Sequence, residues 1–136
     1  MHHLHQFNFP AILASAVALW VLGALWYSPV LFAKPWMAMV PVPAEGKKNT
    51  MIAGMISSFI GDIVLAFILA HFVIWAGAET FDRGAFIGFI SWLGFIAAPG
   101  FPQGIYESRP FRLFAINTGY MLVGLIGIGG LLAVWR

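Results

Sequence analysis

The chain has 136 residues, of which 61% are hydrophobic and 9% are charged. A soluble domain carries about 25% charged residues, so this composition excludes a water-covered surface and indicates a protein that faces lipid. The formal net charge of +2 without long basic runs argues against a nucleic-acid partner, and the absence of cysteine excludes disulfides and thiol chemistry.

Four stretches are apolar for the roughly 20 residues that a membrane crossing needs. The first is too long for the core of a signal peptide and follows no Lys or Arg, so we expect it to remain in the mature protein. We predict an all-α fold, a single domain over residues 1–136 that forms an integral membrane bundle of four transmembrane helices. The helices make two hairpins with both termini on the same side. The predicted spans cover about residues 8–33, 50–78, 84–106 and 111–135.

The basic residues predict an orientation. Five of the seven Lys and Arg fall in the first and third loops, and two fall on the opposite side. Because basic loops favour the cytoplasmic face, we expect a protein of the cytoplasmic (inner) membrane with both termini outside.

Asp62 is the acidic residue inside the second span. It lies about 18 Å from the cytoplasmic end of that span, at 1.5 Å per residue. An ionised carboxylate at such a depth costs roughly 2.5–3.5 kcal/mol, so it must be protonated, paired or hydrated. Two interpretations stay open: an ion or proton site inside the bundle, or an acid that holds helices together by hydrogen bonds. His71 follows nine residues later, half a turn out of phase, and is expected to be a packing residue.

Other polar side chains are expected in the same half of the membrane and form, with Asp62, a candidate intramembrane polar site. These are Tyr27, Ser58, Gln103 and Asn117. The alternative is that each bonds its own backbone or a neighbouring helix, which contributes about 0.6 kcal/mol.

The third span contains a candidate helix break at Pro99, Gly100 and Pro102. Prolines remove backbone donors, and broken helices line binding sites in transporters. The alternative is a kink or an early helix end. Beyond it, Arg109 and Arg112 are possible contacts for an anionic lipid headgroup, or partners of a surface ion pair.

The start of the chain contains His2, His3 and His5, which are weak candidates for metal binding. A free amine with a histidine at position three suits copper(II) or nickel(II). Solvated terminal residues are the simpler interpretation, so we predict neither a metal nor a cofactor. No phosphate loop, zinc-protease motif or nucleophile elbow is present, and we predict that the chain is not an enzyme.

Two motifs resemble a known family. One runs from Gly23 through Trp26-Tyr27-Ser28-Pro29 to Trp36, and the other from Arg109-Pro110 through Ile116-Asn117 to Gly119-Tyr120. Together they are similar to the domain of unknown function 1761 family, small bacterial membrane proteins with about four spans, over nearly the whole chain. The resemblance implies the same fold and implies no activity.

The sequence therefore favours a small polytopic membrane protein that acts as a homo-oligomeric channel or transporter, with its acidic site at Asp62. The alternatives are a structural or accessory subunit of a larger membrane complex and a lipid-binding membrane protein. The expected partners are the lipid bilayer and further copies of the chain, or other subunits.

Overall fold

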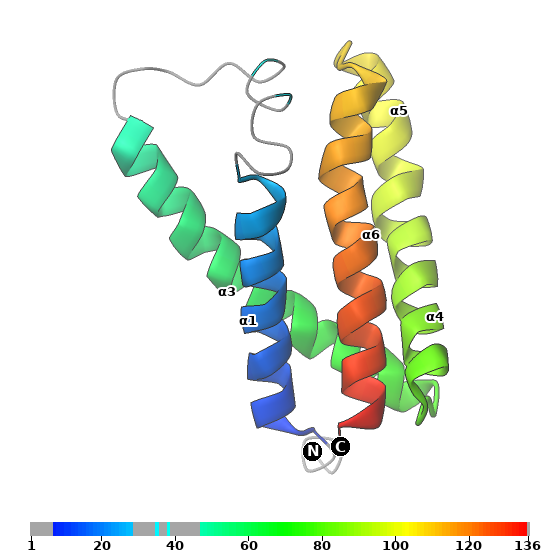
Figure 1. Cartoon of the computed structure of the whole chain (residues 1–136). Coiled ribbons are helices and arrows are strands. Elements are labelled where there is room, and N and C mark those ends of the chain that lie inside the picture. The colour runs from blue at the N-terminus through cyan, green and yellow to red at the C-terminus, as the bar shows by residue number, and fades with distance from the viewer. Residues whose placement is uncertain (1–6, 29–34, 36–37, 39–46, 136) are drawn as a thin grey trace.

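The computed structural model describes residues 7–28, 35, 38 and 47–135. All its regular elements are helical, and the two ends of the chain lie at the same end of the bundle (Figure 1). The predicted all-α bundle is thus confirmed. Its elements are α1 (Phe9–Trp26), α3 (Lys47–Trp75), α4 (Phe81–Trp92), the π-helical segment η2 (Leu93–Ala97), α5 (Ala98–Tyr106) and α6 (Phe111–Val134).

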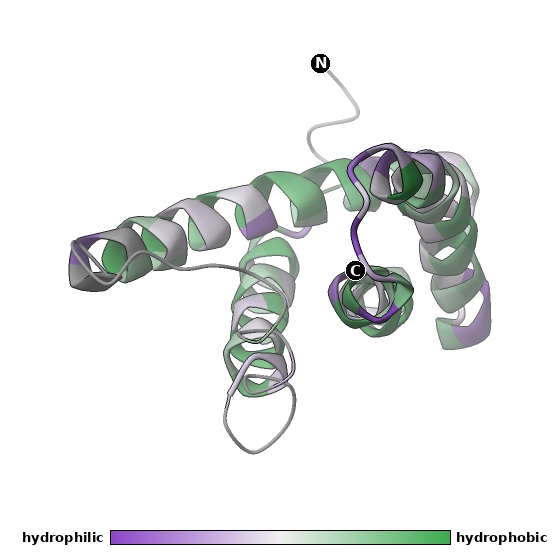
Figure 2. Ribbon diagram, turned by 90° about the horizontal axis from the view of Figure 1, so that it is seen from above, coloured by the Kyte–Doolittle hydropathy of each residue, from purple (hydrophilic) through white to green (hydrophobic). Residues whose placement is uncertain are grey.

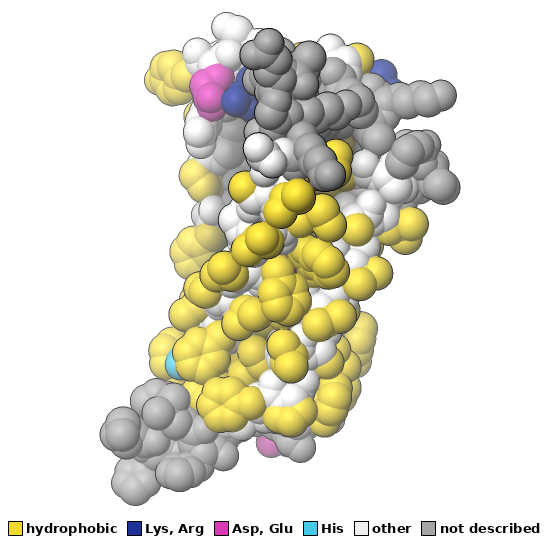
Figure 3. All heavy atoms as spheres, turned by 90° about the vertical axis from the view of Figure 1, so that its left-hand side faces the viewer, with side chains coloured by type: hydrophobic (Ala, Val, Ile, Leu, Met, Phe, Trp, Pro, Cys, Tyr) yellow, Lys and Arg dark blue, Asp and Glu magenta, His cyan; other side chains and the backbone are white. Residues whose placement is uncertain are grey.

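Four stretches of helix are long and apolar enough to cross a membrane, as predicted. In the space-filling view, a band of hydrophobic side chains separates charged groups at the two ends of the molecule (Figure 3). This arrangement is that of a membrane protein. The four spans are Phe9–Trp26, Met51–Trp75, Phe81–Tyr106 and Phe111–Val134.

The boundaries of three spans differ from the predicted ones, and the second ends at Trp75 rather than at residue 78. The first helix ends at Trp26, because Tyr27 leaves the helical conformation with ψ of 17°, and residues 29–33 of the predicted span lie outside the described part. The third span begins at Phe81 rather than at residue 84, and its first turn includes Asp82. A carboxylate suits this position because the helix N-terminus carries partial positive charge.

Helices α4 and α6 pack backbone against backbone. A Cβ atom placed on Gly84 would lie 2.1 Å from the Gly129 carbonyl oxygen, and one on Gly88 would lie 2.0 Å from the Leu125 carbonyl oxygen. Only residues without a side chain allow such an approach, which is the usual device where lipid provides no hydrophobic force between helices. This glycine seam makes α4 and α6 the most closely packed pair of the fold.

Helix α3 crosses the other helices obliquely and extends beyond them on one side (Figures 1 and 2). Its carboxyl-terminal half is buried at Ala66, Leu69, Ala70 and Val73. Its amino-terminal half leaves the bundle, so its large apolar side chains are exposed. These are Met51, Ile52, Met55, Ile56 and Ile60.

The predicted helix break in the third span is not a break. The chain passes from α4 to α5 through the π-helical turn η2, in which the Ala98 N–H donates to the Leu93 carbonyl five residues earlier. This wider turn directly precedes Pro99, whose nitrogen has no hydrogen to donate. The proline is thus accommodated by one widened turn, Pro102 lies inside α5, and the helix continues to Tyr106.

Candidate intramembrane polar site

Asp62 is buried in the middle of α3. Its side chain is 8% exposed, and its Oδ2 atom has no hydrogen-bond partner among the described residues. Measured along the helix, it lies about 16 Å from Met51 and about 20 Å from Trp75, at 1.5 Å per residue. The carboxyl group is therefore held near the centre of the membrane, away from both water layers.

The register of α3 turns Asp62 inward. It lies four residues before Ala66 and eight before Ala70, so these three residues share one face of the helix. Ala66 and Ala70 are buried in the core, whereas the neighbouring Ile60 and Val64 are exposed. Asp62 is thus the first buried residue among those described along α3.

Tyr120 of α6 lies within electrostatic reach of Asp62 and of Tyr27. Its hydroxyl donates to the Leu19 carbonyl oxygen of α1 at 3.0 Å. The Tyr27 and Tyr120 rings meet edge to face with centroids 5.9 Å apart. Side chains of α1, α3 and α6 therefore converge at this level. The sequence analysis did not propose Tyr120 as a site residue, although it follows Asn117 by one helical turn.

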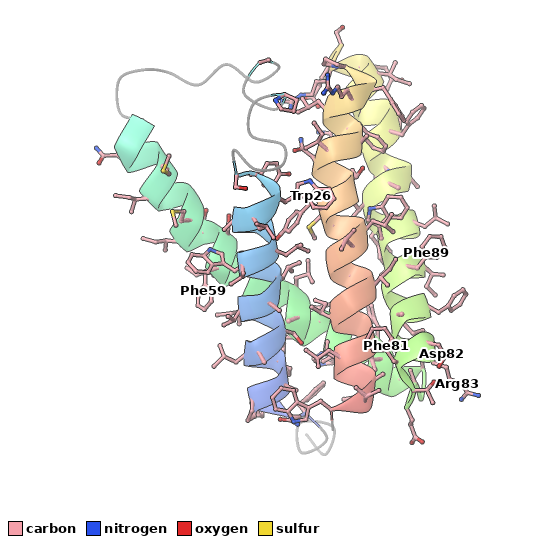
Figure 4. The ribbon with its side chains drawn as sticks, in the orientation of Figure 1. Trp26, Phe59, Phe81, Asp82, Arg83 and Phe89 are labelled. Atoms are coloured by element: carbon pink, nitrogen blue, oxygen red, sulfur yellow. The ribbon has the colours of Figure 1, made fainter. Side chains whose placement is uncertain are left out.

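Tyr27 and Asn117 are brought together, as expected for a shared network. The Tyr27 hydroxyl donates to the Asn117 Oδ1 atom at 2.8 Å. Next to it, the Trp26 side chain reaches from the end of α1 toward α6, where its indole N–H donates to the Ile116 carbonyl oxygen at 2.9 Å (Figure 4). These two bonds join the carboxyl-terminal end of α1 to the first turns of α6.

Ser15 is a second buried polar group that sequence reasoning missed. It is fully buried in α1, and its Oγ atom has no hydrogen-bond partner within the described part of the chain. Two ring contacts join this part of the chain to α3, Trp20 with Phe59 at 5.7 Å and Phe7, just before α1, with Phe67 at 5.3 Å. Along each helix, Ser15 and Asp62 lie between these contacts, so both lie in the section over which α1 and α3 run together.

The other predicted site residues lie elsewhere. Ser58 is one turn before Asp62 on the same face of α3, but it is exposed. Gln103 is exposed on α5, as are Pro99 and Pro102, while Gly100 faces the Phe114 ring. The structure therefore does not bring Ser58 or Gln103 to Asp62.

The described arginines lie at the ends of the helices. Arg83 is at the start of α4 and points away from the bundle (Figure 4), while Arg109 and Arg112 are exposed at the opposite end. The Arg109 Nε atom is 3.5 Å from the Glu107 Oε1 atom. Thus none of the arginine side chains that the structure describes is a counter-ion for Asp62. A headgroup contact at Arg109 and Arg112 stays a prediction, and His2, His3 and His5 lie outside the described residues.

His71 does not face Asp62. Its Nδ1 atom lies 2.9 Å from the Phe67 carbonyl oxygen, and its ring packs against those of Phe7 and Trp75 with centroids 4.4 Å and 5.3 Å away. This aromatic cluster occupies the end of the bundle near the termini.

The comparisons with known proteins identify a family and nothing beyond it. The family model described as "Protein of unknown function (DUF1761)" matches residues 10–133, which is nearly the whole chain. No curated protein and no solved structure matches.

Proposed function

We infer the function of this chain, which belongs to the DUF1761 family of proteins of unknown function, from its own residues. We propose that it is a homo-oligomeric channel or transporter in which Asp62 is the intramembrane acidic site. The proposal is for transport and not for catalysis. It places the protein in the cytoplasmic membrane with both termini outside, on the basis of the basic first and third loops.

The burial of the Asp62 Oδ2 atom, which has no hydrogen-bond partner among the described residues, carries the proposal. Buried polar atoms are almost always bonded, and an intramembrane acid costs roughly 2.5–3.5 kcal/mol to insert. An acid that only held helices together would have its oxygen atoms satisfied by the neighbouring helix. A carboxyl oxygen without a hydrogen-bond partner at the membrane centre is instead available to bind a transported ion.

The packing of the helices supports an oligomer. The centre of the bundle is filled by apolar side chains such as Leu19, Leu125 and Ile128, so an ion cannot cross the whole membrane inside one copy and its path has to involve surfaces between copies. The amino-terminal half of α3 offers such a surface. Around Gly54 and Gly61 there is open space in the described structure, which is the property of a position where another helix can approach closely.

The test is ion flux in liposomes that contain only the purified protein. We expect flux of protons or of small cations, and we expect Asp62→Asn to abolish it, because the amide keeps the size of the side chain and loses its charge. Asp82→Asn is the matched control, since Asp82 is an exposed carboxylate in the first turn of α4. Unchanged flux in Asp62→Asn would refute the proposal.

A second candidate is a structural or accessory subunit of a larger membrane complex. The same exposed half of α3 favours it, because another protein could cover Met51, Met55 and Ile56 as well as a second copy could. The native mass of the protein, extracted gently from its host membrane, distinguishes the two. An assembly of one component supports the transporter, whereas stable association with other chains, together with absence of flux from the purified protein, supports the subunit.

A further inference from the structure

The polar groups of the bundle form a series that leads from one membrane face to its centre. At the end where α1 finishes and α6 begins are Tyr27 and Asn117, next comes Tyr120, and at the centre are Asp62 and Ser15. We propose that Asp62 binds a proton, that Tyr120 and Tyr27 relay it from this face alone, and that Ser15 accepts the hydrogen bond of the protonated acid. The inference rests on the proposed function and names its cargo and its side of access.

Each member of the series can pass a proton. A tyrosine hydroxyl both donates and accepts, and its hydrogen rotates to suit its neighbours. At present the Tyr27 hydroxyl donates to Asn117, which lies in the second turn of α6, and the Tyr120 hydroxyl donates to the Leu19 carbonyl. When the Tyr120 hydroxyl rotates from the Leu19 carbonyl to the Asp62 carboxylate, it transfers its proton to the carboxylate. Its oxygen atom then accepts a proton from the direction of Tyr27.

The proton balance is simple. The Asp62 carboxylate takes up one proton from water at the Tyr27 face and becomes a neutral acid, and it releases the same proton when the direction reverses. In the neutral form the acid O–H becomes a donor, and the Ser15 Oγ atom is an acceptor in the same section of the α1–α3 interface. One hydrogen bond would satisfy both of the buried oxygen atoms that have no partner among the described residues.

The chemistry of the site fits a proton better than a metal ion. Calcium takes six to eight oxygen ligands and magnesium takes six, whereas here the side chains supply the carboxyl group and one or two hydroxyls. Within the described residues no three His, Asp or Glu side chains are grouped so that they could hold a metal. A proton needs only one carboxylate, and it removes the charge that makes burial costly.

On the other side of Asp62 the interior is apolar. Between Ser15 and the end that carries the termini, the buried side chains of α1, α3 and α6 are hydrophobic, and they include Ala11, Ile12, Leu69, Val73, Leu132 and Ala133. Among the described residues, Tyr120 of α6 is a titratable group within electrostatic reach of Asp62, and Tyr27, which follows α1, contacts the Tyr120 ring. On α3, His71 belongs to the aromatic cluster, and α4 contributes only Asp82 and Arg83 at its far end. The relay therefore opens toward one face.

The experiment follows the carboxyl group itself. The protein is reconstituted in liposomes in one orientation, and the infrared band of a protonated carboxyl group is recorded after a step in pH on either side. The Asp62 band, identified by its loss in Asp62→Asn, should respond rapidly to a step at the Tyr27 face and slowly to a step at the other. Tyr120→Phe, which keeps the ring, should slow the rapid response on the order of 100-fold.

Two matched variants control the experiment. Tyr106→Phe changes a tyrosine that is 89% exposed at the same end of the molecule, and it should leave the rate unchanged. Ser15→Ala should shift the position of the carboxyl band, because the acid loses its acceptor. Ser57→Ala should not, since the Ser57 hydroxyl donates to the Gly54 carbonyl of its own helix.

The outcomes separate this inference from the proposed function. Cation flux that depends on Asp62, without a protonated carboxyl band, would support the transporter and overturn the proton site. A band with a one-sided response but without flux would keep the proton site and overturn the transporter. An equal response to both faces, or a rate unaffected by Tyr120→Phe in a folded protein, would overturn the relay.

Discussion

The glycine seam between α4 and α6 provides the most direct test of the packing. In Gly88→Ala the added methyl group would meet the Leu125 carbonyl oxygen at 2.0 Å, whereas ordinary contact begins at 3.4 Å. The obstacle is backbone and not the end of a flexible side chain, so the two helices have to separate by about 1.4 Å. Gly84 faces the Gly129 carbonyl oxygen in the same way one turn away, so the contacts along the whole seam weaken together.

The expected change in the free energy of unfolding follows from two opposing effects. Overpacking of a tight interface costs about 1–3 kcal/mol, and a gap of 0.5–1 Å already loses a quarter to a half of a dispersion contact. Replacing glycine by alanine in a helix recovers up to about 1 kcal/mol. We therefore expect Gly88→Ala to lower the free energy of unfolding by about 1–2 kcal/mol.

Gly127→Ala is the matched control for this variant. It lies in α6 with no atom within 4 Å of the position of the added Cβ, so only the helix-propensity gain applies. The measurement is reversible unfolding of the purified protein in mixed micelles with increasing sodium dodecyl sulfate, followed by circular dichroism. If Gly88→Ala resists unfolding as well as Gly127→Ala does, the backbone contact between α4 and α6 is not present in the membrane protein.

Two further predictions concern the ends of the helices. Trp26→Phe removes the indole donor to the Ile116 carbonyl and should lower the free energy of unfolding by about 0.6 kcal/mol beyond the loss of ring area. Trp75→Phe changes a tryptophan that is 67% exposed, and it should lower this free energy less in the same unfolding assay. The chain has no cysteine, so single cysteines placed at Ser108 and at Glu79 report the topology. We expect an impermeant reagent to label Glu79→Cys, but not Ser108→Cys, on intact cells. The reverse result would overturn the proposed orientation.

The fold was predictable because the hydrophobic effect, which determines which segments enter the membrane, requires long apolar stretches in the sequence. Long uncharged stretches separated by basic loops specify the number of helices and the shared side of the termini. The oblique path of α3 was not predictable. Both halves of α3 carry large apolar residues, Met and Ile in the amino-terminal half and Leu, Ile, Val and Phe in the carboxyl-terminal half, so their presence alone does not distinguish the half that packs from the half that faces outward.

The candidate site was predicted in part, for a similar reason. Depth in the membrane follows from position in the span, and it correctly suggested that Tyr27 and Asn117 lie close together. Helical spacing alone placed Ser58 beside Asp62, but Ser58 is exposed. Ser15 escaped attention because a single serine among alanines has no pattern, and its importance comes only from its burial in the α1–α3 interface.

The glycine seam and the acidic residue lie on different helices. α6 is joined to α4 by the glycine seam and by the Trp92 indole, which donates to the Thr118 carbonyl at 2.8 Å. The acid lies on α3, outside that pair. Because Gly88 and Asp62 are on different helices and share no hydrogen-bond partner, the effects of changing them on stability should add. A loss of flux in Asp62→Asn without a loss of stability would therefore indicate a defect of the acidic site and not of the folded bundle.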